Sequence, residues 1–350
     1  MVSGYEVRIL APIDRTSVNF AELNCKVQPL PMHGKGTNVA EELLLFLRLY
    51  RAIQKIRPDV FLTFTVKPVV YGGLAARIIG IPTIPTVTGL GTAFINETWV
   101  TRVVGVLYRA GLLRAKSVLF QNLDDSSLFV KRRFVKEDQV AQLPGSGIDL
   151  KKFLAVPTPS TKDRDVTIFL MIGRMLWDKG VGEFVKAAEI VKQANPNTEF
   201  QLLGELGSDN ATAISIEEIN IWQQKKIITY LGETDDVRNF IEEADCVVLP
   251  SYREGLPRTL LEAGAMGRPV LTTRAVGCKD VVEDGITGLL CNPRDAVDLA
   301  NKMEVFLDLT QSEKTRMGRE GRKKVAREFD EQIVIHRYKK IIAATVNSRK

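Results

Sequence analysis

The chain has 350 residues, of which 45% are hydrophobic and 26% are charged, enough apolar material to fill about two domain cores. No apolar run approaches the roughly 18 residues that a membrane-spanning helix needs, and no secretory signal opens the chain. The four cysteines are widely spaced with no C-x-x-C pair, which predicts free thiols and neither a disulfide nor a metal site.

The formal net charge of +6 belongs entirely to the first half of the chain. Residues 1–150 hold 18 Lys/Arg and 12 Asp/Glu, whereas residues 151–350 hold 30 of each. This imbalance favours attraction of the first half to an anionic membrane or to a diphosphate-linked acceptor. Nucleic acid is a poorer fit, because no recognition motif and little interleaving of aromatic residues accompany the charge.

Strands and helices are predicted to alternate along the whole chain, as in doubly wound α/β domains. In the first half, strands are expected at 6–11, 26–30, 59–64, 83–88, 117–121 and 139–143, and helices at 39–55, 69–79, 97–115 and 126–134. A linker around Pro157 and Pro159 follows, and the alternation restarts at Val166 and runs to about Leu307. Helices at 312–328 and 332–346 end the chain. The predicted parts are residues 1–155, residues 166–328, and a C-terminal helix in 329–350 that packs back toward the first part.

The predicted helix at 97–115 and the residues after it are basic and amphipathic. Between Trp99 and Leu119 apolar residues alternate with Arg102, Arg109, Arg114 and Lys116, and a cluster at 131–133 follows. Such a segment can lie on anionic lipid. It can equally pack its apolar stripe on the sheet of its own domain, which is the favoured interpretation for the helix itself.

The segment TIFLMIGRMLWDKG (167–180) predicts an anion site. A buried strand ends at Gly173 and Arg174, and Lys179 follows shortly after it. Open parallel sheets bind their ligands at the carboxyl ends of the strands. Arginine offers a planar donor fork and lysine a point charge, so the pair suits a diphosphate.

The segment PSYREGLPRTLLEAGAMGRPVL (250–271) places two glutamates, Glu254 and Glu262, around a predicted helix start. Pro257 is expected to be the first helical residue, which leaves the N–H groups of Arg258 and Thr259 facing a ligand. A helix start binds anions, and flanking carboxylates accept hydroxyl groups. The pattern therefore fits a nucleotide sugar; the alternative is an ordinary strand–loop–helix with surface glutamates.

These segments carry a resemblance that extends over essentially the whole chain. IGRMLWDKG, then LGETDDVRNFIEEADCVVLPSYREGLPRTLLEAGAMGRPVL, then GCKDVVEDGITGLL (277–290) resemble glycosyltransferase family 4, retaining enzymes of the GT-B fold. VTGLGTAFI (87–95), LYRAGLLRAKSVLFQNLDD (107–125) and LPGSGIDLKKF (143–153) are similar to the subgroup that builds bacterial surface glycans. Within that subgroup, the chain resembles enzymes that add N-acetylgalactosamine to an undecaprenyl-diphosphate-linked sugar.

The resemblance implies two Rossmann-like domains facing a cleft, with the acceptor bound by the first and a UDP-sugar, expected to be UDP-N-acetylhexosamine, by the second. It implies that Glu254 contacts the donor hexose, that Glu262 binds the ribose, and that Arg174 and Lys179 hold the diphosphate. Arg174, Lys179 and Glu254 are thus the expected catalytic residues. The other donor-side positions are Gly173, Gly255, Leu256, Pro257 and Arg258 near the sugar and phosphates, and Asp235, Asp236 and Val237 near the base.

On the acceptor side the expected residues are Lys67, Gly89, Gly91 and Thr92. Histidine is scarce: His33 lies in a glycine-rich loop and His336 on the last helix, so no general base is evident. This is compatible with a retaining route in which the departing diphosphate oxygen takes the acceptor proton, without metal or other cofactor. The expected location is cytoplasmic, peripheral on the inner face of the plasma membrane.

One departure from the family lies at the amino end. The family opens about one β–α unit before the position of Gly4, as though this unit were missing here. Two alternatives therefore stay open beside the transferase: an inactive nucleotide-sugar-binding remnant, and a nucleotide-sugar 2-epimerase, which would need acid–base residues in the cleft.

Three tempting patterns are given structural roles. Asp163 to Asp165 spells D-x-D but stands in the polar linker, so no metal site is expected there. Asp124 and Asp125 are expected to cap a helix that starts near Ser126, although the resemblance leaves a structural role at the cleft open. Gly145 to Gly147 is expected to be a turn between the domains and not a dinucleotide fingerprint.

Overall fold

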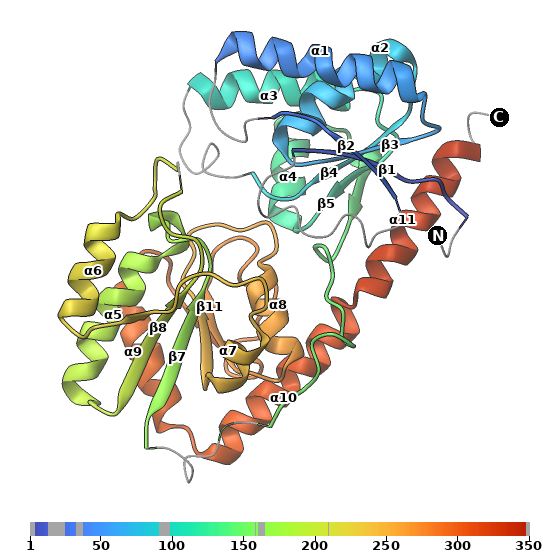
Figure 1. The fold of residues 1–350 in the computed structure, drawn as a ribbon. Helices are drawn as coiled ribbons and strands as arrows, with labels where there is room; N and C mark the ends of the chain where they lie inside the picture. Colours follow the sequence, from blue (N-terminus) through green and yellow to red (C-terminus); the bar gives the residue numbers. More distant parts are fainter. Residues whose placement is uncertain are drawn as a thin grey trace.

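A computed structural model describes residues 4–12, 25–32, 38–90, 99–157, 159, 165–208 and 210–347. Within these residues every strand pairing is parallel, and the strands form one six-stranded, one four-stranded and one two-stranded sheet. Figure 1 shows the six-stranded sheet with its helices as one body and the other two sheets with theirs as a second. No helix in the described part of the chain is long and apolar enough to cross a bilayer.

The six-stranded sheet has the order β12-β11-β10-β7-β8-β9. Its strands are β7 (Thr167–Ile172), β8 (Thr198–Leu203), β9 (Thr229–Tyr230), β10 (Cys246–Leu249), β11 (Val270–Thr273) and β12 (Gly288–Cys291). The chain first winds from β7 toward β9 and then from β10 toward β12, so β7 and β10 are neighbours at the point where the winding reverses. Loops that follow two such strands diverge and leave a crevice, where doubly wound sheets bind ligands.

Helices cover both faces of this sheet, which explains why its central strands β7 and β10 are almost entirely apolar and buried (Figure 1). The helices are α5 (Val181–Ala194), α6 (Ile216–Gln224), α7 (Arg238–Glu243), α8 (Arg258–Ala265), α9 (Ala296–Asp308) and α10 (Gln311–Glu328). Strands and helices enclose one continuous core, in which Phe169, Phe184, Phe200 and Phe306 are fully buried.

The four-stranded sheet of the N-terminal half has the order β3-β4-β5-β6, with β3 (Phe61–Phe64), β4 (Thr83–Val87), β5 (Val118–Phe120) and β6 (Val140–Gln142). β1 (Arg8–Ala11) and β2 (Lys26–Pro29) pair only with each other. The N-terminal strands therefore form two sheets, not one continuous sheet. The helices of this half are α1 (Val39–Ile56), α2 (Gly73–Ile79), α3 (Trp99–Leu112) and α4 (Leu123–Lys131).

Two helix predictions need correction. A π-helical turn, η2 (Pro68–Gly72), precedes α2, so the single helix expected at 69–79 is divided. α4 begins at Leu123, three residues before the expected Ser126, because the Asn122 side chain caps it by accepting from the Asp125 N–H at 2.8 Å. Asp125 therefore lies in the first turn, where its side chain is free to make other contacts.

The chain passes between the two halves twice, and the two passages lie side by side. Ile148 accepts a backbone hydrogen bond from Glu331 at 3.1 Å and donates one to Phe329 at 2.9 Å. α11 (Glu331–Asn347) then packs on the four-stranded sheet, with Val334 against Ile84 and Leu119, and with Tyr338 bonded to Thr86 at 2.7 Å (Figure 1). Gly147 fits this junction because a Cβ there would meet the Glu331 Cα at 2.5 Å.

Candidate functional site

The loops after β7 and β10 meet at an ion pair. The Lys179 ammonium lies 2.5 Å from the Glu254 carboxylate, and the two side chains are 23% and 13% exposed. The approach is close because Gly180, at φ 79°, lets the first loop lie against the end of β10: a Cβ there would meet the Pro250 carbonyl at 2.2 Å. Two residues predicted separately from their motifs are therefore in direct contact.

Gly173 and Arg174 follow β7 at the same edge. Arg174 is exposed and, among the described residues, has no carboxylate within ion-pair distance. The Thr259 hydroxyl donates to the Ile172 carbonyl at 3.3 Å, which places the start of α8 over the end of β7. The amino end of α8 therefore lies beside the segment that carries Arg174.

The start of α8 differs by one residue from the prediction. Pro257 is the N-cap, with extended backbone at φ −73° and ψ 114°, and the helix begins at Arg258. Within the part of the chain that the structure describes, no acceptor lies within hydrogen-bonding distance of the Arg258 and Thr259 N–H groups. The free N–H groups expected at the start of the helix are therefore present, although the helix begins one residue later than predicted.

Glu262 lies one turn further along α8 and is only 9% exposed. Burial raises the pKa of its carboxyl group, and the Arg258 guanidinium, whose Nε lies 2.8 Å from Oε1, acts in the opposite direction. Lys152 and Asp236 are close enough to influence the same pKa. Glu262 is therefore a carboxylate held in a low-dielectric position by a cation of its own helix.

The predicted base-side residues border this carboxylate. Asp235 and Asp236 are exposed, and Val237 is the N-cap of α7. Asp236 accepts hydrogen bonds from the Arg238 guanidinium, and these bonds lower the pKa of Asp236 to about 2. The loop thus presents a permanently ionised side chain beside the less easily ionised Glu262.

The loop that carries Glu254 is also fixed by the N-terminal half. A Cβ on Gly255 would meet the Thr88 carbonyl at 2.0 Å, and Gly89 packs on Gly255 in the same way, with its own Cβ position 3.0 Å from the Gly255 nitrogen. The Asn122 amide donates to the Gly255 carbonyl at 2.8 Å. Leu256 packs against Gly145. The predicted donor residue Gly255 and acceptor-side residue Gly89 therefore touch.

A second set of contacts joins the same two segments. Arg253 forms an ion pair with Asp125, which is completely buried, and Lys279 lies 3.0 Å from Asp124. Burial raises the pKa of Asp125, while Arg253 and Asn122 counteract it. The structural role that was left open for Asp124 and Asp125 is to hold the amino end of α4 against the Glu254 loop.

On the predicted acceptor side, Lys67 is paired with Glu42 of α1 at 2.6 Å. Burial and Glu42 together raise the pKa of the neighbouring Tyr71 to about 12. Gly91 and Thr92 lie outside the described residues. Lys67 is therefore not a solvated charge but part of a half-buried cluster at the end of β3.

Three residues of these clusters were not predicted to have a functional position: Asn122, Arg253 and Glu42. Asp124 and Asp125 were expected to cap the helix, and Asn122, which is the N-cap of α4, was not predicted as one. Arg253 precedes Glu254 and was readable only as part of the motif. Glu42, at the start of an amphipathic helix, gave no signal beyond favourable placement in a first turn.

Together, the described residues offer a defined chemistry. Arg174, Lys179 and the start of α8 supply positive charge between two carboxylates, which can accept hydroxyl hydrogens on either side. Among these residues no group of three or more His, Cys, Asp or Glu side chains is placed to hold a metal ion. The arrangement suits a ligand with an anionic centre and hydroxyl groups at both ends.

Comparison with protein families gives two matches. A family described as "Glycosyl transferases group 1" matches residues 156–324. One described as "Glycosyl transferase 4-like" matches residues 2–122. The two segments cover most of the chain, and the first of them includes every donor-side position named above.

Individual proteins are similar over most of the chain. A Campylobacter jejuni N,N'-diacetylbacillosaminyl-diphospho-undecaprenol alpha-1,3-N-acetylgalactosaminyltransferase is 29% identical over 352 residues, covering 96% of this chain and 90% of that protein. An Escherichia coli UDP-Gal:alpha-D-GlcNAc-diphosphoundecaprenol alpha-1,3-galactosyltransferase is 25% identical, covering 78% of this chain and 73% of that protein.

Solved structures share the fold. Anabaena Alr3699/HepE in complex with UDP superposes with a TM-score of 0.75 at 18% identity, covering 93% of this chain and 88% of that one. Sucrose-phosphate synthase from Thermosynechococcus elongatus gives 0.78 at 19% identity, covering 98% and 90%.

Proposed function

The chain belongs to the group 1 glycosyl transferases and has the GT-B fold, and from this premise we propose that it moves an N-acetylhexosamine from a UDP-sugar to a lipid-diphosphate-linked sugar. The single observation that carries the donor part is the meeting of Lys179 with Glu254 beside the start of α8, at the reversal of the sheet. The acceptor class is supported by the two bacterial relatives, whose names specify undecaprenol-diphosphate-linked sugars.

In this proposal the donor lies along the ends of β7 and β10. Glu262 accepts hydrogen bonds from the ribose hydroxyls, and residues 235–237 border the base. The free N–H groups of Arg258 and Thr259, with Arg174 and Lys179, hold the diphosphate. Because a lysine ammonium has three donors, Lys179 can bind a phosphate oxygen while it keeps its bond to Glu254. Glu254 is then fixed where it accepts from a hexose hydroxyl.

The proposed reaction is retaining. The bond from the sugar C1 to the diphosphate oxygen breaks, the acceptor oxygen bonds to C1 on the same face, and the acceptor proton passes to the departing oxygen. Negative charge grows on the diphosphate during this step, so Arg174 and Lys179 lower the barrier by binding the transition state more strongly than the substrate. Lys67, Gly89, Gly91 and Thr92 are proposed for the acceptor side. The site of action is proposed to be the cytoplasmic face of the plasma membrane, where the protein binds peripherally.

Transfer of radiolabelled sugar from UDP-N-acetylgalactosamine to an undecaprenyl-diphosphate-linked sugar tests this proposal. Arg174→Ala should remove about 2–3 kcal/mol of transition-state stabilisation, a fall of roughly 30- to 160-fold in kcat. Arg316→Ala, which removes an exposed arginine of α10, is the matched control and should leave kcat unchanged.

The stereochemistry is read separately, from the anomeric configuration of the product by NMR. An α-linked product from the α-linked donor supports retention. A β-linked product would refute retention. An Arg174→Ala variant that turns over at the wild-type rate would refute the proposed role of Arg174.

A further inference from the structure

A cavity of about 210 Å³ lies in the N-terminal half. It is away from the loop that carries Glu254 and Gly255, called the donor loop below. It is bordered by Thr83, the first residue of β4, whereas Thr88 and Gly89, just after the end of β4, touch the donor loop. The length of the strand, about 16 Å for five residues, therefore separates the cavity from that loop. The cavity does not belong to the donor site.

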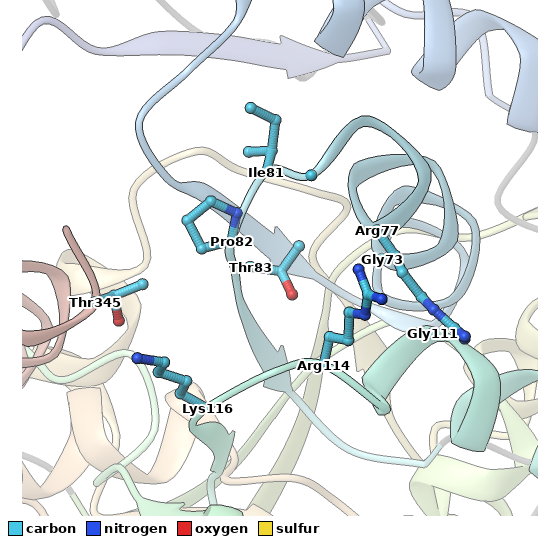
Figure 2. A pocket seen from close by; sticks show the side chains of 10 residues that line it. Gly73, Arg77, Ile81, Pro82, Thr83, Gly111, Arg114, Lys116 and Thr345 are labelled. Atoms are coloured by element: carbon cyan, nitrogen blue, oxygen red, sulfur yellow. The ribbon is translucent and has the colours of Figure 1, made fainter. Parts of the chain in front are cut away.

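Three cations surround this cavity, and no acidic residue lines it: Arg77 comes from the last turn of α2, and Arg114 and Lys116 from the connection between α3 and β5. Within the described ranges none of the three has a carboxylate at ion-pair distance; Arg77 makes one long hydrogen bond, 3.4 Å, to the Ala110 carbonyl. Figure 2 shows Arg77 and Arg114 on one side of the opening and Lys116 on the other, near Thr345.

The carboxyl ends of three helices offset part of this positive charge. α2, α3 and α11 all reach the cavity with their carboxyl ends, and each such end carries about −0.5 elementary charge. Three helix ends amount to roughly −1.5, which is half of the +3 supplied by Arg77, Arg114 and Lys116. The cavity therefore keeps a net positive charge of about 1.5, enough to favour binding of an anion.

The form of the cavity favours a small tetrahedral anion. α2 and α3 cross backbone to backbone beside the cavity, since a Cβ on Gly73 would meet the Gly111 carbonyl at 2.6 Å. Its volume is below the roughly 300 Å³ at which pockets for larger ligands begin. The arginine fork matches phosphate oxygens in geometry.

The surroundings indicate where a phosphate would come from. Exposed aliphatic side chains adjoin the cations in sequence: Ile78, next to Arg77, is 64% exposed, and Leu113, next to Arg114, is 56% exposed. Residues 99–116, which include α3 and most of the connection after it, hold four Lys/Arg and no acidic residue. Cations beside exposed aliphatic groups are typical of surfaces that lie at a lipid headgroup layer.

We propose that Arg77, Arg114 and Lys116 form a site for the phosphate group of an anionic phospholipid, with Ile78 and Leu113 entering the headgroup layer beside it. This rests on the peripheral membrane binding proposed above and names the residues and the lipid group that carry it. None of these residues belongs to the donor site, and Arg114 and Lys116 lie in the connection that follows α3.

The test is co-sedimentation of the full chain with vesicles of phosphatidylcholine, with and without about 30% phosphatidylglycerol, in the absence of sugar nucleotide. Arg114→Gln combined with Lys116→Gln should weaken binding to the anionic vesicles by about 30-fold, since each cation near such a surface contributes about fivefold. The control, Arg51→Gln with Lys55→Gln, removes the same charge from exposed positions of α1 outside the cavity and should weaken binding by less than about threefold.

A second arm separates the lipid phosphate from free phosphate and from general screening. Sodium phosphate should release the wild-type chain from the vesicles more effectively than sodium chloride of equal ionic strength. Equal loss in both double variants, or equal release by both salts, would show only diffuse charge and overturn the site. Binding of inorganic phosphate without any binding to vesicles would overturn the lipid source. Because nucleotide is absent, each outcome is independent of the donor chemistry.

Discussion

The two glutamates of the donor motif are held in different ways. Glu262 lies within α8, and its partner Arg258 is four residues earlier on the same helix. Glu254 lies in a loop, and its partner Lys179 is 75 residues away. The neighbours of Glu254, Arg253 and Gly255, are in turn held by the N-terminal half. One helix thus determines the proposed ribose contact, whereas the proposed sugar contact depends on how the two halves meet.

The largest effect should come from removing the support of the loop. Asp125→Ala leaves the Arg253 guanidinium, 17% exposed, without its buried partner, and should cost about 3 kcal/mol of the free energy of unfolding, the lower end for such pairs. Asp124→Ala is the control: its partner Lys279 is exposed, so the cost should stay below about 1 kcal/mol. Denaturant titration measures both, and equal costs would mean that the Asp125 pair does not hold the loop.

A change in the loop itself should affect transfer nearly as strongly. In Gly255→Ala the new methyl group would collide with the Thr88 carbonyl, so the loop must move away from the N-terminal half. A displacement of about 1 Å can cost roughly 100-fold in rate, and kcat/KM should fall accordingly. Gly321→Ala in α10, where a Cβ has only an ordinary contact at 3.4 Å, should change kcat/KM little. If Gly255→Ala transferred at the wild-type rate, the sugar contact would not depend on the meeting of the halves.

UDP binding by Glu262 of α8 should instead depend on pH. Burial raises the pKa of Glu262, so on acidification it takes up a proton at a higher pH than an ordinary glutamate and loses acceptor strength for the ribose. Asp236, with a pKa of about 2, stays ionised through this range. The affinity for UDP should therefore fall by up to about tenfold between pH 7 and pH 5, in excess of the change in Glu262→Gln.

In Glu262→Gln the ionisation of UDP itself remains, so the difference between the two pH profiles isolates the carboxylate. Identical profiles would mean that the Glu262 carboxylate does not take part in UDP binding.

The smallest effect on UDP binding is expected from Lys67→Ala. This change leaves Glu42 half-buried without its cation and should cost about 1 kcal/mol of the free energy of unfolding. The affinity for UDP should stay within about twofold, because Lys67 belongs to the N-terminal half. A tenfold loss of UDP affinity, measured by calorimetry, would contradict the division into a donor and an acceptor side.

The same contrast explains how much of the molecule could be predicted from the sequence. The order of strands and helices followed from the apolar pattern, and Glu262, Arg174 and Lys179 were predicted to bind the donor because they lie near the ends of predicted elements. The start of α4 was missed because Asn122 and two aspartates compete as caps. The pairing of Asp125 with Arg253, 128 residues away, could not be predicted, because no local pattern specifies which buried charges meet across two halves.

The most direct test of the account is a calorimetric titration of the chain with UDP, GDP and ADP, repeated with Glu262→Ala. Selective binding of UDP, weakened at least tenfold by the substitution, is the predicted result. A folded chain that binds none of the three nucleotides, or that binds UDP equally well without Glu262, would contradict the proposed donor site.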